Sequence, residues 1–172
     1  LDSSIEDCSI IIPTKAFRDE GTSYHYQPAS DMIDIDLKYE QDFLEILDKY
    51  KFDHTRGYTW TTDAFFRETP DKIEYFKNNG AVCVEMEGSV IASVCKRLGV
   101  DYFTFYYAGD NLDSTEWDER SLSGLTNIDK KKEAKSNPII VLIIAALEMQ
   151  NRRYNYETMF RYLKSGLLGI DT

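Results

Sequence analysis

The sequence predicts an α/β fold in which a central mixed β-sheet is flanked by helices within a single domain. Short apolar runs rich in β-prone residues alternate with amphipathic helical segments along the chain. Two carboxylates stand at the junction between one such run and the helix after it. The 172 residues show no internal repeat, low-complexity segment or change in composition that would mark a second domain.

The first segments predict a strand, a loop and a helix. Residues 8–12 form an apolar run that we expect to be a buried strand ended by Pro13. Residues 17–28 are polar, aromatic and punctuated by glycine, which is typical of an ordered loop. Residues 37–50 have the apolar period of an amphipathic helix, and Asp36 is the expected cap.

The middle of the chain predicts a strand, a helix and a second strand. Residues 55–61 combine threonine, tyrosine and tryptophan with the alternation of a strand. Thr69 and Pro70 are typical of a helix start, and the pair at 79–80, Asn-Gly, is typical of a helix end. The apolar residues 81–84 then predict the next strand.

The second half predicts further helices and one more strand. Small residues in 88–98 indicate a closely packed helix that Gly99 ends. The aromatic residues 100–108 predict a central strand, followed by a turn. Residues 137–150 and 154–164 predict a buried helix and an amphipathic helix.

Composition excludes several classes of function. The net charge of −10 argues against binding to a nucleic-acid backbone or an anionic membrane surface. The longest apolar run, 139–147, is too short to span a bilayer, and no signal peptide is evident. Three cysteines without metal-ligand spacing (Cys8, Cys83 and Cys95) are expected to be free thiols in a reducing compartment, and no metal site is predicted. We therefore expect a soluble cytoplasmic protein.

Glu85, Met86 and Glu87 occupy the junction between the strand at 81–84 and the helix at 88–98. Two carboxylates this close can accept hydrogen bonds from a vicinal diol such as that of a sugar. Open α/β sheets bind ligands at the carboxyl ends of their strands, which is where this junction lies. The alternative is that both carboxylates only favour the start of the helix through its dipole.

Other candidate residues follow neighbouring strands. Phe65 and Phe66 come after the strand at 55–61, where one ring could face a flat ligand, although both could be core residues. Asp110 follows the predicted strand at 100–108, which would bring it to the same sheet edge as the carboxylates, although aspartate is also an ordinary turn residue. Arg18 and His25 lie in the polar loop, where a surface ion pair and a structural histidine are the simpler interpretations.

These segments together resemble the nucleoside phosphorylase family, meaning the hexameric bacterial-type purine nucleoside and uridine phosphorylases. The resemblance rests on four segments in the order found in that family: 18–23, 63–66, 84–87 and 109–111. It extends from about Ser9 to Leu147.

The resemblance implies roles for individual residues. Glu87 would bind the ribose 2′- and 3′-hydroxyls, with Met86 packing on the sugar and Glu85 assisting. Phe65 would stack on the base. Asp110 would be the general acid that protonates purine N7, so that the base leaves more easily and phosphate attacks an oxocarbenium-like sugar.

Supporting residues are implied as well. Arg120 would support Asp110, and Arg18 belongs to the arginine loop of the family. His25 and Tyr26 would lie near a subunit interface, where neighbouring chains complete each other's pockets. The implied assembly is a homo-oligomer built from dimers, a hexamer.

The resemblance also implies the reaction, and it leaves alternatives open. The expected activity is reversible phosphorolysis of a nucleoside to free base and ribose 1-phosphate, with inorganic phosphate as co-substrate and no other cofactor. Residues 109–110, Gly-Asp, and the lack of the uridine enzymes' Gln and Arg in register at 67–71 favour a purine, whereas the arginine loop is more like the uridine enzymes. The alternatives are a uridine phosphorylase, a nucleosidase that uses water, and a catalytically incomplete homologue.

The beginning of the chain adds a further expectation. The sequence starts at Leu1 and enters an apolar strand almost at once. The family's phosphate-binding segments would precede this point. We therefore expect residues 1–172 to be the C-terminal two-thirds of a nucleoside phosphorylase-like domain, with the nucleoside half of the site and without the phosphate half.

Overall fold

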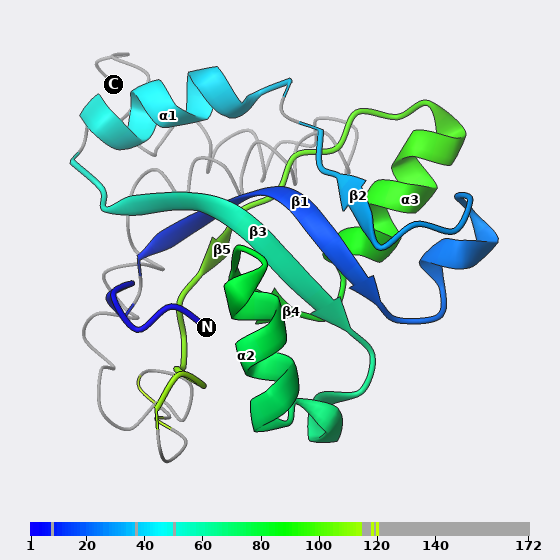
Figure 1. The fold of residues 1–172 in the computed structure, drawn as a ribbon. Coiled ribbons are helices and arrows are strands. Elements are labelled where there is room, and N and C mark those ends of the chain that lie inside the picture. The colour runs from blue at the N-terminus through cyan, green and yellow to red at the C-terminus, as the bar shows by residue number, and fades with distance from the viewer. Residues whose placement is uncertain (8, 37, 50, 115–117, 119, 121–172) are drawn as a thin grey trace, which may run out of the picture. The chain divides into compact units, whose positions relative to one another are not determined.

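A computed structural model describes residues 1–7, 9–36, 38–49, 51–114, 118 and 120 (Figure 1). By compactness the chain divides into Leu1–Leu122 and Ser123–Thr172, and every described residue belongs to the first unit. The helices predicted at 137–150 and 154–164 lie outside the described residues.

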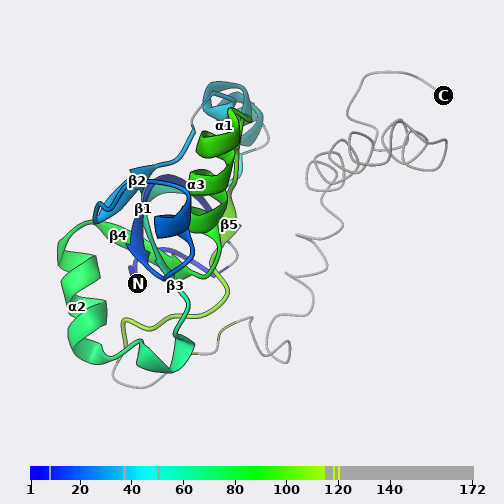
Figure 2. The ribbon, with the colours of Figure 1, turned by 90° about the vertical axis from the view of Figure 1, so that its right-hand side faces the viewer.

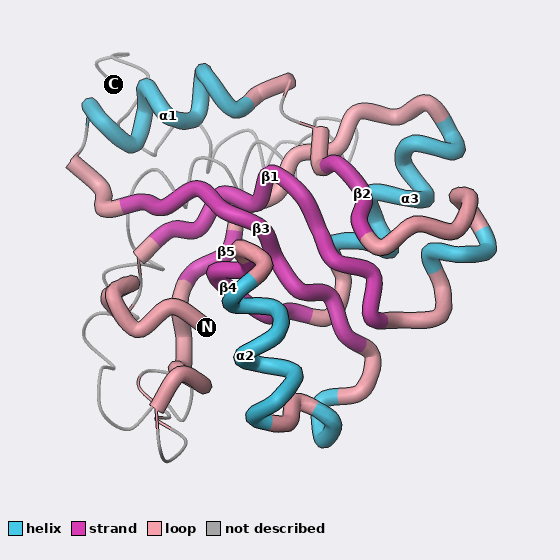
Figure 3. Tube along the Cα trace, in the orientation of Figure 1, coloured by secondary structure: helices cyan, strands magenta, loops and turns pink. Residues whose placement is uncertain are grey.

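A mixed five-stranded sheet forms the centre of the first unit, as predicted (Figure 3). Strands β1 (Ile10–Asp19), β3 (His54–Thr62) and β4 (Ala81–Glu85) are parallel neighbours in that order. On the other side of β1, two short strands pair with it in the antiparallel sense. They are β2 (Met32–Asp34), which pairs with the second half of β1, and β5 (Tyr106–Tyr107), which pairs with its start.

Three α-helices and two short 3-10 helices connect these strands. The α-helices are α1 (Glu40–Lys49), α2 (Pro70–Asn78) and α3 (Gly88–Leu98), and the 3-10 helices are η1 (Ser23–His25) and η2 (Phe65–Arg67). Helix α3 has the bounds that the sequence predicts, because Gly99 adopts the left-handed conformation (φ 65°) that stops a helix.

Helices α2 and α3 cover opposite faces of the sheet (Figure 2). Successive residues of β1 contribute to different layers, because side chains alternate between the two faces of a strand. Phe17 packs with Trp60 and with Phe76 of α2, whose ring stacks on the indole at a centroid distance of 4.3 Å. Ala16 packs on the other face with Ala92 of α3. Apolar burial on both faces therefore fixes the position of each helix.

A third apolar cluster contains the middle of β4. The thiol of Cys83 is buried there with Ile5 and Ile11. Burial raises the pKa of Cys83 to about 12, so the side chain is a neutral thiol at physiological pH.

The three parallel strands end at one edge of the sheet. Asp19 is in register with Thr62, and Thr61 is in register with Glu85. The segments that follow β1, β3 and β4 therefore leave the sheet at the same edge, which we call the carboxyl edge. This is the position at which α/β sheets place their ligand sites.

The prediction that Pro13 ends the first strand is wrong. Strand β1 runs on to Asp19, and its pairing with β3 shifts register between Pro13 and Lys15. A bulge accommodates a residue that has no N–H to donate, which explains why proline interrupts the pairing without ending the strand. Residues 17–19, expected in a loop, therefore belong to the sheet.

The prediction of a central strand at residues 100–108 is also wrong. Only Tyr106 and Tyr107 pair, and they do so antiparallel to the start of β1. The rings of Phe103 and Phe105 pack instead against Phe43 of α1, at centroid distances of 5.2 and 4.9 Å. Their aromatic character therefore serves helix packing, and Asp110 does not come directly off a parallel strand at the carboxyl edge.

Helix α1 begins later than the sequence predicts. It starts at Glu40, and the carboxylate of Asp36, its expected cap, accepts a hydrogen bond from the backbone N–H of Lys38. Within the described part of the chain, no helix is long and apolar enough to cross a membrane.

Candidate active site at the carboxyl edge

The turn between β4 and α3 is organised by the carboxylate of Glu85. Its Oε1 accepts hydrogen bonds from the hydroxyls of Thr59 (3.1 Å) and Thr61 (2.5 Å) of β3. Its Oε2 accepts from the backbone N–H groups of Glu87 (2.8 Å) and Gly88 (2.6 Å). Glu85 thus satisfies the free N–H groups at the start of α3 and joins that start to the neighbouring strand.

Glu87 and Met86, in the same turn, have exposed side chains. The side chain of Glu87 is exposed and makes no capping hydrogen bond to α3, and none of the described residues donates to its carboxylate. Met86 beside it is 44% exposed. The two carboxylates therefore differ in the structure: Glu85 holds the turn, and Glu87 is exposed beside it.

Gly88 allows this turn to pack closely. A Cβ atom at this position would lie 2.5 Å from the hydroxyl of Tyr106 and 2.8 Å from Oε1 of Glu85. Both distances are shorter than a side chain tolerates, so the first residue of α3 must be glycine for the turn to keep its shape.

The segment after β1 is held by a second buried carboxylate, Glu20, which is 7% exposed. Its Oε2 accepts from the backbone N–H of Ser23 (2.9 Å), and its Oε1 accepts from the hydroxyl of Ser89 in α3 (2.8 Å). Burial by itself would raise the pKa of Glu20, but these hydrogen bonds from Ser23 and Ser89 outweigh it and lower the pKa. Glu20 therefore stays ionised at neutral pH.

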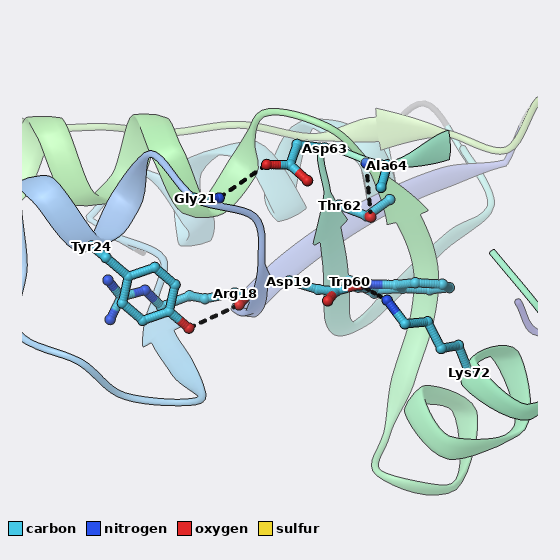
Figure 4. Close-up of polar contacts among 9 residues, drawn as sticks. All are labelled: Arg18, Asp19, Gly21, Tyr24, Trp60, Thr62, Asp63, Ala64 and Lys72. Carbon is cyan, nitrogen blue, oxygen red and sulfur yellow. Dashed lines mark hydrogen bonds and ion pairs between the residues drawn. The ribbon is translucent and has the colours of Figure 1, made fainter. Parts of the chain in front are cut away.

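Arg18 shapes the rest of this loop from a buried position. Its Nε donates to the hydroxyl of Ser23 (2.8 Å), and one terminal nitrogen donates to the carbonyl of Pro28 (2.7 Å) and the hydroxyl of Ser30 (2.9 Å). Its guanidinium lies 4.1 Å from the ring centroid of Tyr24, whose hydroxyl donates to the Arg18 carbonyl (Figure 4). The surface ion pair with Asp19 or Glu20 that the sequence allowed is absent from the described residues.

The segment after β3 carries two exposed aromatic rings. Phe65 is 49% exposed and Phe66 is 94% exposed, with ring centroids 5.2 Å apart in an edge-to-face arrangement. Asp63, just before them, accepts a hydrogen bond from the backbone N–H of Gly21 (3.0 Å), which joins this segment to the one after β1 (Figure 4). Neither phenylalanine is a core residue.

Helix α2 is attached to the same edge through Asp19. The carboxylate accepts from Nε1 of Trp60 (3.0 Å) and pairs with Nζ of Lys72 (2.7 Å), as Figure 4 shows. The start of α2, and the phenylalanines just before it, are therefore tied to the last residue of β1.

Asp110 and Arg120 are the predicted acid and its supporting residue. Both line a small cavity of about 60 Å³, together with Leu1, Val84 and Tyr106. Arg120 donates to the carbonyl of Ile5 (2.7 Å).

Asp110 also acts on a second carboxyl group. Burial first, and the charge of Asp110 second, raise the pKa of Glu68 to about 6. Glu68 directly follows η2, so Asp110 is electrostatically coupled to the segment after β3.

His25 lies exposed at the end of η1, which packs against α3.

No group of three or more His, Cys, Asp or Glu side chains in the described residues is arranged to hold a metal ion.

The structure thus brings four of the predicted site residues, Phe65, Glu85, Met86 and Glu87, to the carboxyl edge, with Arg18 near the end of β1. Sequence reasoning missed Glu20 and Ser89. The only signal for them was the density of polar groups in the loop and the small residues at the start of α3.

Two solved structures are similar to this chain. One is the AMP nucleosidase from Bacteroides thetaiotaomicron VPI-5482, with a TM-score of 0.54 and 18% identity, over 59% of this chain and 45% of that one. The other is a futalosine hydrolase mutant of Helicobacter pylori strain 26695, with a TM-score of 0.51 and 18% identity, over 62% of this chain and 52% of that one. Identity at this level shows a shared fold alone.

Curated relatives match over parts of this chain. One subunit of the ATP-dependent helicase/deoxyribonuclease of Clostridioides difficile (strain 630) is 84% identical over 44 residues, which is 26% of this chain and 4% of that protein. The same subunit from Clostridium botulinum (strain Loch Maree / Type A3) is 59% identical over 103 residues, which is 59% of this chain and 7% of that protein. The chain therefore spans less than a tenth of the length of these two relatives.

The family comparison covers most of the chain. The model of the Phosphorylase superfamily matches residues 1–146. This match agrees with the mixed sheet between helices and with the fold of the two solved structures. The chain belongs to the phosphorylase superfamily.

Proposed function

We propose that this protein cleaves the N-glycosidic bond of nucleosides, with inorganic phosphate as the attacking group and with purine nucleosides as the preferred substrates. The observation that carries this proposal is the exposed carboxylate of Glu87, which no described residue binds and which lies in a turn held rigidly by Glu85. A carboxylate on a fixed turn at the carboxyl edge suits a sugar diol, because it accepts two hydrogen bonds at once.

The neighbouring side chains suit the rest of a nucleoside. Met86 offers an exposed apolar surface for the sugar, and Phe65 offers a half-exposed ring for stacking on a base. Both leave the sheet at the edge that carries Glu87.

We assign the acid step to Asp110. Protonating N7 of a purine neutralises the negative charge that develops on the base as the glycosidic bond breaks. The charge of Asp110 contributes, after burial, to the raised pKa of Glu68, so Asp110 lies close enough to interact with the segment that carries Phe65. Arg120, which lines the same cavity as Asp110, would orient that carboxyl group.

Hydrolysis is the second candidate reaction. The two solved structures with this fold are named as a nucleosidase and a hydrolase, so their names favour water as the attacking group. Glu87 and Asp110 would keep their roles in that case, since only the group that attacks the sugar differs. A homologue that binds nucleosides without cleaving them is the third candidate.

A phosphate-dependence assay separates these reactions. The full protein is incubated with inosine or uridine, with and without phosphate, and the sugar product is identified. Ribose 1-phosphate formed only with phosphate supports phosphorolysis, free ribose formed without phosphate supports hydrolysis, and nucleoside binding without either product supports the third candidate. The preferred nucleoside identifies the base.

Glu87→Ala tests the sugar site directly. We expect it to raise the nucleoside KM and to lower kcat about 10- to 100-fold, since sugar contacts position the reacting carbon. Glu74→Ala, which changes an exposed glutamate of α2, is the matched control and should keep wild-type kinetics. Normal kinetics in Glu87→Ala would remove Glu87 from the site.

We also propose a cytoplasmic homo-oligomer built from dimers, a hexamer. Sedimentation equilibrium of the full protein tests this, and a monomer at micromolar concentration would contradict it.

A further inference from the structure

A continuous path of hydrogen bonds runs from the loop after β1 to the turn that carries Glu87. Arg18 donates to the hydroxyl of Ser23 (2.8 Å), and the backbone N–H of Ser23 donates to Glu20 (2.9 Å). Ser89 donates its hydroxyl to Glu20 (2.8 Å) and its backbone N–H to the hydroxyl of Thr61 (2.9 Å).

Thr61 closes the path. Its hydroxyl donates to Glu85 (2.5 Å), and Glu85 accepts the backbone N–H groups of Glu87 and Gly88. Ser89 and Thr61 are completely buried, so water does not replace these bonds. The start of α3 is therefore held from two sides, by Glu85 and by Glu20.

Glu20 is the unusual member of this path. It is a buried carboxylate with no ion pair among the described residues, and it accepts only from neutral donors. The hydrogen bonds to Glu20 lower its pKa, so this carboxylate is ionised although none of the described residues forms an ion pair with it. Glu20 is bonded directly to Ser89 in the first turn of α3, and that turn begins next to Glu87.

We propose that Glu20 is a positioning residue: through Ser89 it fixes the first turn of α3 and with it the direction in which the Glu87 carboxylate meets the sugar diol. Glu20 does not touch Glu87, and it does not contact the substrate. This inference rests on the proposed function and adds to it a residue that controls sugar binding.

A second hydrogen bond also joins the loop after β1 to helix α3. The side-chain amide of Gln27 donates to the carbonyl of Ser93, one turn further along α3 (3.3 Å). With Glu20 in place, the loop and the helix are held together at two points about one helical turn apart. If Glu20 is lost, only the longer hydrogen bond, between Gln27 and Ser93, remains.

Three variants test the proposal in the full protein. Glu20→Ala removes both hydrogen bonds. Glu20→Gln is nearly isosteric and retains them, because its amide oxygen accepts from Ser23 and its amide NH₂ donates to the Ser89 hydroxyl. Ser89→Ala removes only the bond between Glu20 and α3, and it serves if Glu20→Ala does not fold.

The matched control is Glu40→Ala. Glu40 is a similarly buried carboxylate, at the start of α1, where it pairs with Arg56 (2.7 Å). Its loss destabilises the protein without touching the path to Glu87, so it shows what a purely structural defect does to kinetics.

Two measurements are made on each variant. In Glu20→Ala and Ser89→Ala we expect the nucleoside KM to rise about 10-fold with the phosphate KM within about twofold, because only sugar positioning changes. We expect hydrogen–deuterium exchange of the amides at 87–89 to speed up about fivefold or more. Their acceptors, Glu85 and Thr61, remain, but the first turn of α3 opens more often once Ser89 no longer bonds to Glu20. Glu20→Gln should restore both values, and Glu40→Ala should change neither.

The outcomes separate this proposal from the proposed function. If the wild-type protein cleaves no nucleoside, the proposed function fails, and exchange at 87–89 still decides whether Glu20 positions the turn. Unchanged exchange in both Glu20→Ala and Ser89→Ala overturns the positioning role, whatever the activity. Faster exchange in Glu40→Ala of the same size also overturns it, because the effect would then be a general loss of stability.

Discussion

Replacing Glu85 by alanine should destabilise the protein far more than replacing Glu87, although the two glutamates are only two positions apart. Glu85 accepts four hydrogen bonds within the chain, whereas no described residue donates to the carboxylate of Glu87. We expect Glu85→Ala to lower the free energy of unfolding strongly and Glu87→Ala to leave it almost unchanged.

The magnitude follows from the groups that lose an acceptor. Thr59 and Thr61 are fully buried, so each hydroxyl left unsatisfied costs about 1–3 kcal/mol. Loss of the cap on α3 costs about 1 kcal/mol more, because water partly satisfies the backbone N–H groups of Glu87 and Gly88. Glu85→Ala should therefore cost about 3–7 kcal/mol, or about 10–20 °C in Tm for a chain of this size. Glu87→Ala should stay within about 0.5 kcal/mol of wild type.

Urea unfolding measures both values. The fluorescence of Trp60, which is 0% exposed in β3, reports loss of the core, and circular dichroism reports loss of the helices. Glu85→Gln should lie between Glu85→Ala and wild type, because a neutral amide keeps part of the hydrogen bonding. If Glu87→Ala proved as destabilising as Glu85→Ala, the conclusion that Glu85 alone supports the turn would be refuted.

Three further predictions concern the surroundings of this turn. Asp110→Asn should lower purine phosphorolysis about 100-fold or more in steady-state kinetics, and full activity would remove Asp110 as the acid. Because the pKa of Glu68 rises from 4.5 to about 6, the folded state binds the proton more tightly and stability falls as the pH rises through that window. Glu68→Gln should therefore raise Tm at pH 7.5 and leave it nearly unchanged at pH 4, whereas a lower Tm at pH 7.5 would contradict this. Gly88→Ala should cost about 1–3 kcal/mol in urea unfolding, because its Cβ would lie 2.5 Å from the Tyr106 hydroxyl; an unchanged midpoint would show that the turn can move aside.

The sequence predicts those elements whose ends are determined locally. Helix α3 has its predicted bounds, since Gly99 ends it through its own backbone conformation. Helix α2 begins where Thr69 and Pro70 predict a start. The parallel order of β1, β3 and β4 agrees with the predicted alternation of strands and helices.

The errors arise where distant contacts decide the structure. Pro13 is compatible with β1 only because the pairing with β3 shifts at that point, and a single segment does not reveal its partner's register. Phe103 and Phe105 have strand-like composition, but the ring of Phe43 determines where they pack. Propensity gives way to tertiary packing in both cases.

The same limit applies to the candidate site. Charge and spacing at 84–87 do not distinguish the two carboxylates, and only the family resemblance gives Glu87 the main role and Glu85 an assisting one. They differ because Thr59 and Thr61 of a neighbouring strand donate to one of them. Glu20 escapes prediction for a related reason, since its partner Ser89 is far along the chain.

The buried thiol of Cys83 allows the opening of β4 to be followed by chemical labelling. Alkylating reagents react with the thiolate, and with a pKa of about 12 almost none is present while the strand is in place. Modification of Cys83 at neutral pH therefore requires β4 to separate from its neighbours, and its rate measures the free energy of that opening. Because β4 ends at Glu85, chemical labelling of a natural cysteine would reveal how often the proposed sugar-binding turn loses its support.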